Sequence, residues 1–134
     1  MSLETGLSAK VKAEVTADMT ALSQGSGEVE GLASPVMICM MEAASVKALQ
    51  GQLMSGMTSV GQRVEVTHVA PTPVGMEVVA TATLVEVEGR HLVFSVVVED
   101  QGGVIGKGTH VRMVVDKSRF EDRIKARWTV GQQQ

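Results

Sequence analysis

Residues 34–54, SPVMICMMEAASVKALQGQLM, form the one long apolar segment of this 134-residue chain. Ser34 is a good N-cap residue, and Pro35 at the first helical position loses no hydrogen bond that it would have made. Glu42 and Lys47 are the only charges, so the segment is apolar almost all round. It is therefore predicted to be a long central helix that is buried rather than half-solvated.

On both sides of this helix, apolar and polar residues alternate with the two-residue period of β-strands. One strand is predicted on the N-terminal side, from Ala9, Val11, Ala13 and Val15. Four more are predicted after the helix, over residues 64–70, 77–87, 92–98 and 106–115. The expected fold class is α+β, with an antiparallel sheet of about five strands wrapped around one long central helix.

The length fits a single domain over residues 1–134. Near its end, Phe120, Ile124 and Trp128 fall at helical spacing. Residues 120–134 are therefore expected to form a tail, with a short amphipathic helix docked on the body before a disordered end. The central helix also needs cover on more than one side, and one sheet supplies only one. A second subunit related by twofold symmetry is the expected source of the rest.

The composition excludes several functional classes. The net charge is −3, and there are only two Phe, one Trp and no Tyr, so nucleic-acid binding is not expected. Cys39 is the only cysteine, which excludes an intramolecular disulfide and a multi-cysteine zinc site. The sequence contains neither a signal sequence nor an apolar run of roughly 18 residues. We therefore expect a cytoplasmic protein that does not bind membranes.

Two ionisable residues occupy positions where the pattern requires apolar ones. Glu42 lies in the middle of the predicted helix, and His68 lies between Val66 and Ala70 on the apolar face of a predicted strand. A buried carboxylate or imidazole needs a partner. If the strand face packs on the helix, Glu42 and His68 can pair and form a general acid or base near neutral pH.

Each of these residues also has a purely structural explanation. His68 can be a satisfied core residue and Glu42 a structural ion pair, while N-capping alone explains Ser34. A continuous helix from Pro35 places Ser34 and Glu42 about 12 Å apart along its axis, so the two are not expected to touch. Cys39 is expected to be a small core residue.

A second group of polar residues lies in the last predicted strand. His110 and Arg112 share a strand face, where they either line a pocket mouth and bind an anionic ligand or belong to an exposed sheet surface. Gly106-Lys107-Gly108 has no following helix, so it is weak evidence for phosphate binding. His68, His91 and His110 alone do not make a zinc site, and neither a metal nor a cofactor is expected.

Five motifs, in order and over about two-thirds of the chain, carry a family resemblance. They are Ala33-Ser34-Pro35 leading to Met41-Glu42-Ala43-Ala44; Ser59-Val60-Gly61; Thr67-His68-Val69-Ala70-Pro71-Thr72-Pro73-Val74-Gly75; Val87-Glu88-Gly89-Arg90; and Ile105-Gly106-Lys107-Gly108-Thr109-His110-Val111-Arg112. Together they resemble the hotdog-fold thioesterase superfamily, and most closely its fluoroacetyl-CoA thioesterase-like group.

The resemblance implies a hydroxyl, a glutamate and a histidine that act on an acyl-CoA thioester. These residues correspond to Ser34, Glu42 and His68 in this chain. The best-known member of the group has threonine at the position of Ser34. Gly61 matches a glycine near the thioester. The resemblance also implies a homodimer, or a tetramer built from it, with active sites near the subunit interface. One departure is residues 25–28, Gly-Ser-Gly-Glu, where the fluoroacetyl-CoA enzyme has lid phenylalanines. Selectivity for fluoroacetyl groups is therefore not expected.

The expected function is hydrolysis of a small or medium acyl-CoA thioester to the free acid and CoA. His68, oriented by Glu42, would activate either Ser34 or a water molecule, and Gly61, His110 and Arg112 are the candidate substrate-binding residues. The alternatives are a non-catalytic acyl-CoA-binding or regulatory hotdog protein, a hotdog hydratase, and an interaction scaffold. A basic cluster near the C-terminus can contact CoA phosphates, but acidic residues lie between its members and favour a solvated helix face. The cluster consists of Lys117, Arg119, Arg123, Lys125 and Arg127.

Overall fold

The computed structural model describes residues 3–132 of the chain, which form one antiparallel sheet with helices. The elements in chain order are β1 (Ser8–Glu14), a 3₁₀ turn (Ala17–Met19), α1 (Ala21–Gln24), α2 (Ser34–Ala48), β2 (Met57–His68), β3 (Glu77–Glu88), β4 (His91–Asp100), β5 (Gly103–Asp116) and α3 (Lys117–Gln132). The strands are ordered β1-β3-β4-β5-β2, and every neighbouring pair is antiparallel. The predicted α+β fold with a five-stranded antiparallel sheet is confirmed.

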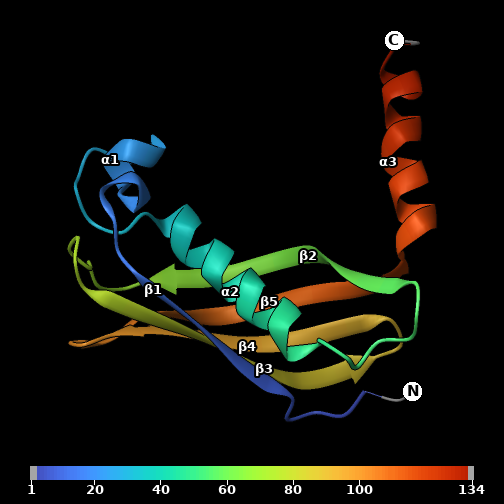
Figure 1. Cartoon of the computed structure of the whole chain (residues 1–134), viewed down its shortest axis with the longest axis horizontal. Helices are drawn as coiled ribbons and strands as arrows, with labels where there is room; N and C mark the ends of the chain where they lie inside the picture. The colour runs from blue at the N-terminus through green and yellow to red at the C-terminus, as the bar shows by residue number, and fades with distance from the viewer. Residues whose placement is uncertain (1–2, 133–134) are drawn as a thin grey trace.

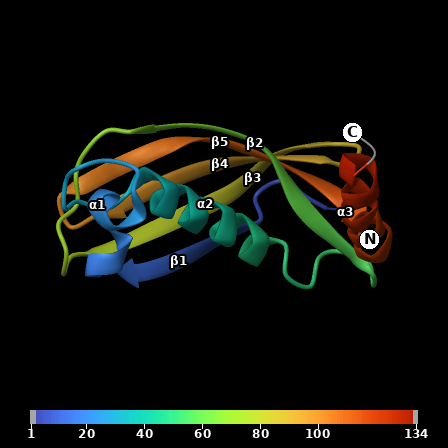
Figure 2. The same cartoon turned by 90° about the horizontal axis from the view of Figure 1, so that it is seen from above.

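The central helix α2 lies along one face of this sheet, and the sheet curves over it (Figures 1 and 2). The helix packs chiefly against β1 and β3 and makes fewer contacts with β4, β5 and β2. The half of the sheet face formed by β5 and β2 is therefore the less covered half. Since β2 is an edge strand of 12 residues, one long strand edge has no neighbour within the described chain.

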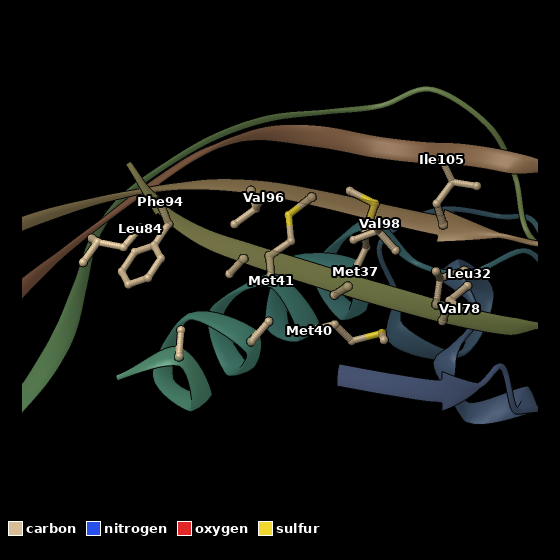
Figure 3. Close-up of a cluster of buried hydrophobic side chains, with 14 of the residues drawn as sticks. Leu32, Met37, Met40, Met41, Val78, Leu84, Phe94, Val96, Val98 and Ile105 are labelled. Carbon is tan, nitrogen blue, oxygen red and sulfur yellow. The ribbon is translucent and has the colours of Figure 1, made fainter. Parts of the chain in front are cut away.

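Methionines fill the core between α2 and the sheet. Met37, Met40 and Met41 project from α2 toward side chains of β3 and β4, including Leu84 and Phe94 (Figure 3). All five side chains are buried. Unbranched, flexible Met side chains fill the irregular space that aromatic rings occupy in other cores. The scarcity of aromatic residues is thus compensated at this interface.

Both ends of α2 differ from the prediction. Ala33, not Ser34, is the N-cap residue, and Ser34 is already helical, so the capping explanation of Ser34 is wrong. The helix ends at Ala48 rather than near residue 54, because the chain turns away at Leu49 and reaches Gly51 with φ of 74°. A glycine with positive φ just beyond the last turn is a common helix stop.

The outer face of α2 is exposed, which also differs from the prediction of a helix buried all round. Cys39 is exposed rather than in the core, and Val46 retains 44% of its surface. The physical reason is that one sheet can cover only one side of a helix. The apolar outer face of α2 thus lacks a covering layer within the described chain.

The C-terminal helix α3 is longer than expected, with 16 residues, and it stands out from the end of the sheet (Figure 1). Phe120 is half-buried at its base, but Ile124 and Trp128 are 58% and 72% exposed, so the predicted docking on the body is wrong beyond the first turn. The predicted disordered end at residues 133–134 lies outside the described residues. Within residues 3–132, no helix is long and apolar enough to cross a membrane.

Candidate active site

Ser34 and His68 form a hydrogen-bonded pair at one end of the sheet. Ser34 is the first residue of α2 and His68 is the last residue of β2, and Ser34 Oγ lies 2.7 Å from His68 Nδ1. Backbone contacts outside the two elements hold these ends together. Leu32 N donates to Thr72 O at 2.9 Å, so the segment that enters α2 is tied to the loop that leaves β2. The hydroxyl is therefore directed at an imidazole and does not cap the helix.

The second imidazole nitrogen of His68 has no partner. Its Nε2 is buried and forms no hydrogen bond with any described residue. If Nδ1 accepts the Ser34 hydroxyl proton, then Nε2 carries the other ring hydrogen and is a donor. Buried polar atoms are rarely left unpaired in native proteins, and those that are often belong to functional sites. The pair therefore has the geometry of a hydroxyl and its general base, and no described residue orients the imidazole from its other nitrogen.

A cavity of about 350 Å³ opens beside this pair. Its apolar wall includes Val29, Leu32 and Pro71, and its other side includes Ser26 and Gly27 from the loop after α1. Ser34 and His68 both line it, so a bound group can reach the hydroxyl. Ser26 and Gly27 are small and exposed, so the loop after α1 contributes little bulk to the lining of the cavity.

Glu42, Arg112, His110 and Ser59 form a second group, here called the carboxylate–guanidinium cluster. Glu42 Oε2 lies 3.6 Å from Arg112 Nη1, and the carboxylate side chain is 41% exposed whereas that of Arg112 is 8% exposed. Arg112 donates from Nε to Ser59 Oγ at 2.8 Å and from Nη2 to Ser59 O at 3.0 Å. A buried guanidinium thus has both a counter-charge and neutral acceptors.

His110 occupies the cluster as a neutral imidazole. Burial lowers its pKa from 6.5 and the nearby Arg112 lowers it further, against raising effects from its hydrogen bond to the Arg63 backbone and from Glu42. Nδ1 donates to Arg63 O at 2.8 Å, which leaves Nε2 to accept from Arg112 Nη1 at 3.1 Å. The 3.9 Å approach of His110 Nε2 to Glu42 is therefore not an ion pair. For Arg112 itself, burial lowers the pKa and Glu42 raises it.

Gly61 provides the space in which the Glu42 carboxylate lies. A Cβ at this position would approach Glu42 Oε2 to 2.9 Å and His110 Cε1 to 3.3 Å. Gly61 pairs with Arg112 across the β2–β5 ladder, immediately before a register shift between Gly61 and Arg63. Gly61 therefore lies against the cluster and is itself exposed on β2.

The structure divides the candidate residues into two groups. It brings Ser34 to His68, and it brings Glu42 to Arg112 and His110. Within residues 3–132, Glu42 forms no ion pair with His68, so the pairing expected inside one chain is wrong. Glu42 lies in the middle of α2, whereas His68 lies at the end of β2 and contacts Ser34, the first residue of α2. The two side chains are therefore at different positions along the helix.

Of the two alternatives given for His110 and Arg112, the exposed sheet surface is wrong, because both side chains are buried. Ser59, which accepts from Arg112, belongs to the Ser59-Val60-Gly61 motif but was assigned no role from the sequence, and the Arg63 carbonyl, which accepts from His110, was not singled out. The available signal for Ser59 was its two-residue spacing from Gly61, which places both residues on one face of β2.

The glycines of Gly106-Lys107-Gly108 have a packing role. A Cβ on Gly106 would collide with Met37 of α2, and one on Gly108 would collide with the Glu65 backbone of β2. The motif therefore allows close approach of neighbouring elements rather than phosphate binding. In the described part of the chain, no three His, Cys, Asp or Glu side chains are grouped so that they could hold a metal ion.

The chain is similar to known proteins over most of its length. Residues 15–118 match the family described as fluoroacetyl-CoA-specific thioesterase. The fluoroacetyl-CoA thioesterase of Streptantibioticus cattleyicolor is 38% identical over 102 residues, which cover 76% of this chain and 73% of that protein. A solved structure of the fluoroacetyl-CoA thioesterase FlK has a TM-score of 0.87 and 32% identity, covering 94% of this chain and 98% of the other. A hypothetical protein of the thioesterase superfamily from Thermus thermophilus has a TM-score of 0.85 and 29% identity, covering 95% and 96%.

Proposed function

Because this chain belongs to the fluoroacetyl-CoA-specific thioesterase family, it is an acyl-CoA thioesterase of the hotdog fold, and we propose that Ser34 and His68 carry out its hydrolysis. The matched relatives are thioesterases, which favours catalysis over the alternative of a non-catalytic acyl-CoA-binding protein. The observation that carries the residue assignment is the 2.7 Å contact between Ser34 Oγ and His68 Nδ1. It places a hydroxyl nucleophile and its base within proton-transfer distance.

In the proposed reaction, His68 Nδ1 accepts the Ser34 proton while Ser34 Oγ attacks the thioester carbonyl carbon. Collapse of the tetrahedral intermediate breaks the C–S bond, and the departing CoA thiolate takes the proton from His68. Water then attacks the acyl-serine ester with His68 as base, which releases the free acid and returns the proton to Ser34. Direct attack by a water molecule that His68 activates is the second route to the same products.

The start of α2 supports the developing oxyanion chiefly through its dipole. Pro35 has no N–H, and the N–H groups of Val36 and Met37 both donate to Ala33 O at 3.1 Å. These first-turn donors are therefore engaged. The positive end of the helix still lies beside Ser34, where negative charge develops in the transition state.

We propose that the protein is a homodimer in which β2 and the outer face of α2 are covered by a second copy. The support is the long unpaired edge of β2 together with exposed apolar residues on both elements, such as Val46 at 44% and Val64 at 40%. The exposed Glu42 carboxylate would then face the partner subunit. This arrangement reconciles a catalytic role of Glu42 with its separation from His68 in one chain.

The acyl group is proposed to occupy the cavity beside Ser34 and His68. In the homodimer, Gly61, His110 and Arg112 of the partner subunit would lie on the opposite side of the bound substrate. Small polar residues at 25–28 support acceptance of small or medium acyl groups rather than selectivity for fluoroacetyl.

A location in the cytoplasm is proposed because the exposed free thiol of Cys39 suits a reducing compartment. Sedimentation at several protein concentrations would distinguish monomer, dimer and tetramer.

The decisive experiment is rapid quench of the enzyme with acetyl-, longer aliphatic and aromatic acyl-CoAs, followed by intact mass spectrometry. An acyl adduct that is present in the wild type and absent in Ser34→Ala supports the nucleophilic route. Turnover that persists in Ser34→Ala without an adduct supports the water route. Full CoA release by both Glu42→Ala and His68→Ala would disprove the assignment of the catalytic residues.

Mixing those two variants tests the dimer proposal. If Glu42 of one subunit serves His68 of the other, a mixed dimer of Glu42→Ala and His68→Ala chains contains one complete site. Activity then returns when the two inactive proteins are unfolded together and refolded as a mixture. If both residues serve a site in the same chain, every site in the mixed dimer lacks one residue, and the mixture stays inactive.

A further inference from the structure

Three arginines converge on a groove at the end of the sheet where β5 leads into α3. The groove has a volume of about 400 Å³, and Arg90, Arg119 and Arg123 line it. Its lining residues come from the start of β2, the β3–β4 turn, the end of β5 and the first turns of α3. In Figure 1 the base of α3 lies at the opposite end of the sheet from the start of α2, where Ser34 is located. The active-site chemistry described above uses none of these arginines.

The arginines come from two separate segments, and backbone structure holds both. Arg119 and Arg123 are four residues apart on α3 and therefore share one face of the helix. Arg90 lies in the turn between β3 and β4, where its carbonyl accepts a hydrogen bond from Val114 N at 2.9 Å. Asp116 is the one acid that lines the groove, and its Oδ1 accepts the backbone N–H of Arg119 at 3.0 Å. A chain with a net charge of −3 thus concentrates positive charge at this point.

The rest of the groove is apolar. Met57, Met113, Val115 and Phe120 line it, and the guanidinium of Arg123 lies 5.6 Å from the centre of the Phe120 ring. Guanidinium groups bind phosphate through paired N–H donors. A half-buried ring beside thioethers provides a surface on which a planar base can stack. An apolar floor with a guanidinium rim therefore suits a phosphorylated nucleoside better than an inorganic anion alone.

The groove is also within reach of the proposed substrate site. Met57 precedes Gly61 by four residues on β2, a separation of about 13 Å along the strand at ~3.3 Å per residue. This is shorter than an extended pantetheine arm. Ser34 and His68 of the same chain are out of reach, because His68 is eleven residues from Met57 on β2, about 36 Å along the strand. In the proposed homodimer, however, Glu42 beside Gly61 faces His68 of the partner subunit. A single acyl-CoA molecule can therefore have its nucleotide in the groove while its thioester lies near Gly61, within reach of the partner subunit's Ser34.

We propose that this groove, the arginine groove, binds the 3′-phosphorylated ADP part of acyl-CoA. The inference rests on the proposed function, because it assigns the nucleotide end of the same substrate. It differs from the prediction of a solvated helix face in selecting Arg119 and Arg123 from the basic cluster and adding Arg90. Lys125, which projects from another face of α3 and does not line the groove, is assigned no role.

The test compares two substrates with the same acyl group, acyl-CoA and acyl-pantetheine, which lacks the nucleotide. In the double variant Arg119→Gln/Arg123→Gln, KM for acyl-CoA is expected to rise about tenfold or more, with kcat retained. Kinetics with acyl-pantetheine are expected to be unchanged. Lys125→Gln, which removes one positive charge from the same helix, is the matched control and should leave both substrates unaffected.

Several outcomes would overturn the proposal. They are an unchanged KM for acyl-CoA in the double variant, an equal loss with both substrates, and an equal effect of Lys125→Gln. Calorimetric titration with adenosine 3′,5′-bisphosphate tests the groove without turnover: the wild type should bind it and the double variant should not. If the enzyme hydrolyses no acyl-CoA but binds the bisphosphate through these arginines, the proposed function fails and the groove assignment stands.

Discussion

Two groups of polar residues each include one residue of α2, and they differ in how completely their side chains are hydrogen-bonded. The Ser34–His68 pair has one hydrogen bond of 2.7 Å, and the buried Nε2 of His68 has no partner in the described chain. In the carboxylate–guanidinium cluster, by contrast, Arg112 donates to both oxygens of Ser59 and to the imidazole of His110. The first group has an unused hydrogen-bonding position, and the second has its buried nitrogens paired.

This difference separates a reactive group from an anchoring one. A satisfied polar network fixes the positions of its members and resists rearrangement. An unpaired buried nitrogen costs stability, and such a cost persists in native proteins mainly where function requires it. We therefore expect substitutions at Ser34 and His68 to reduce activity at little cost to stability, whereas substitutions in the cluster reduce stability as well.

The largest effect is expected at the Ser34–His68 pair. Ser34→Ala and His68→Ala should each lower kcat/KM by about 10²–10⁴-fold, because each removes one partner of the proton transfer. The double variant should lose little more than either single variant, since the two residues act as one unit. Steady-state release of free CoA, followed with a thiol reagent, measures all three.

Stability is the control for this first prediction. Ser34 is exposed and its hydroxyl does not cap α2, so Ser34→Ala should change the free energy of unfolding by less than about 0.5 kcal/mol. A loss of activity that accompanies a large drop in the urea midpoint would mean that the pair is structural, and the contrast between the two groups would fail.

The next largest effect is expected from Glu42. Glu42→Ala leaves the buried guanidinium of Arg112 without its counter-charge, and the free energy of unfolding should fall by about 1–2 kcal/mol. The cost is moderated because the carboxylate is 41% exposed and partly screened by solvent. Combining Glu42→Ala with Arg112→Met should cost less than the sum of the two single losses, measured by urea denaturation. Strict additivity would show that the two groups are not coupled.

The sequence predicted the sheet and the central helix, and it supplied candidate site residues, but it did not predict which residues those candidates contact. Ser34 followed by Pro35 is compatible with either an N-cap or a first helical position, which differ by one residue. The choice depends on backbone contacts outside the helix, such as Leu32 N to Thr72 O. Local sequence holds no information on those contacts, so the hydroxyl could not be assigned to His68 by pattern alone.

Arg112 is a second residue whose contact partner could not be predicted from the sequence. An arginine in an alternating strand is usually exposed, and only a partner from a distant element makes its burial tolerable. That partner is Glu42, which is 70 positions earlier in the chain. The sequence singled out both residues as candidates, but their contact depends on how α2 packs across the sheet, and helix periodicity does not specify that packing.

A smaller effect is expected when the space beside the Glu42 carboxylate is filled. Gly61→Ala places a Cβ 2.9 Å from the present position of Glu42 Oε2, and the end of this flexible side chain can move away. The expected loss is about 1 kcal/mol of unfolding free energy. In a Glu42→Ala background the same substitution should cost less, because the colliding atom is gone. An equal cost in both backgrounds, measured by urea denaturation, would locate the strain in the backbone of β2 instead.

The smallest effect is expected in the dependence of stability on pH. His110 has its pKa lowered below 6.5 in the folded protein, chiefly by burial, and recovers its ordinary value on unfolding. As the pH falls through about 6.5, the unfolded chain binds a proton that the folded protein does not, so stability is lost toward acid pH. Urea denaturation at pH 7 and pH 5 should show a smaller loss in His110→Gln than in the wild type.

The surrounding charges make this last prediction specific to the cluster. A proton on His110 would place a positive charge beside the Arg112 guanidinium, whose Nη1 lies 3.1 Å from Nε2, and the Glu42 carboxylate, 3.9 Å from Nε2, offsets it. Glu42→Gln should therefore lower the pKa of His110 further and steepen the loss of stability between pH 7 and pH 5. His91 is exposed at the start of β4, and His91→Gln should leave the slope unchanged. If His110→Gln and His91→Gln behave alike, the acid sensitivity arises elsewhere, and the cluster does not hold His110 neutral.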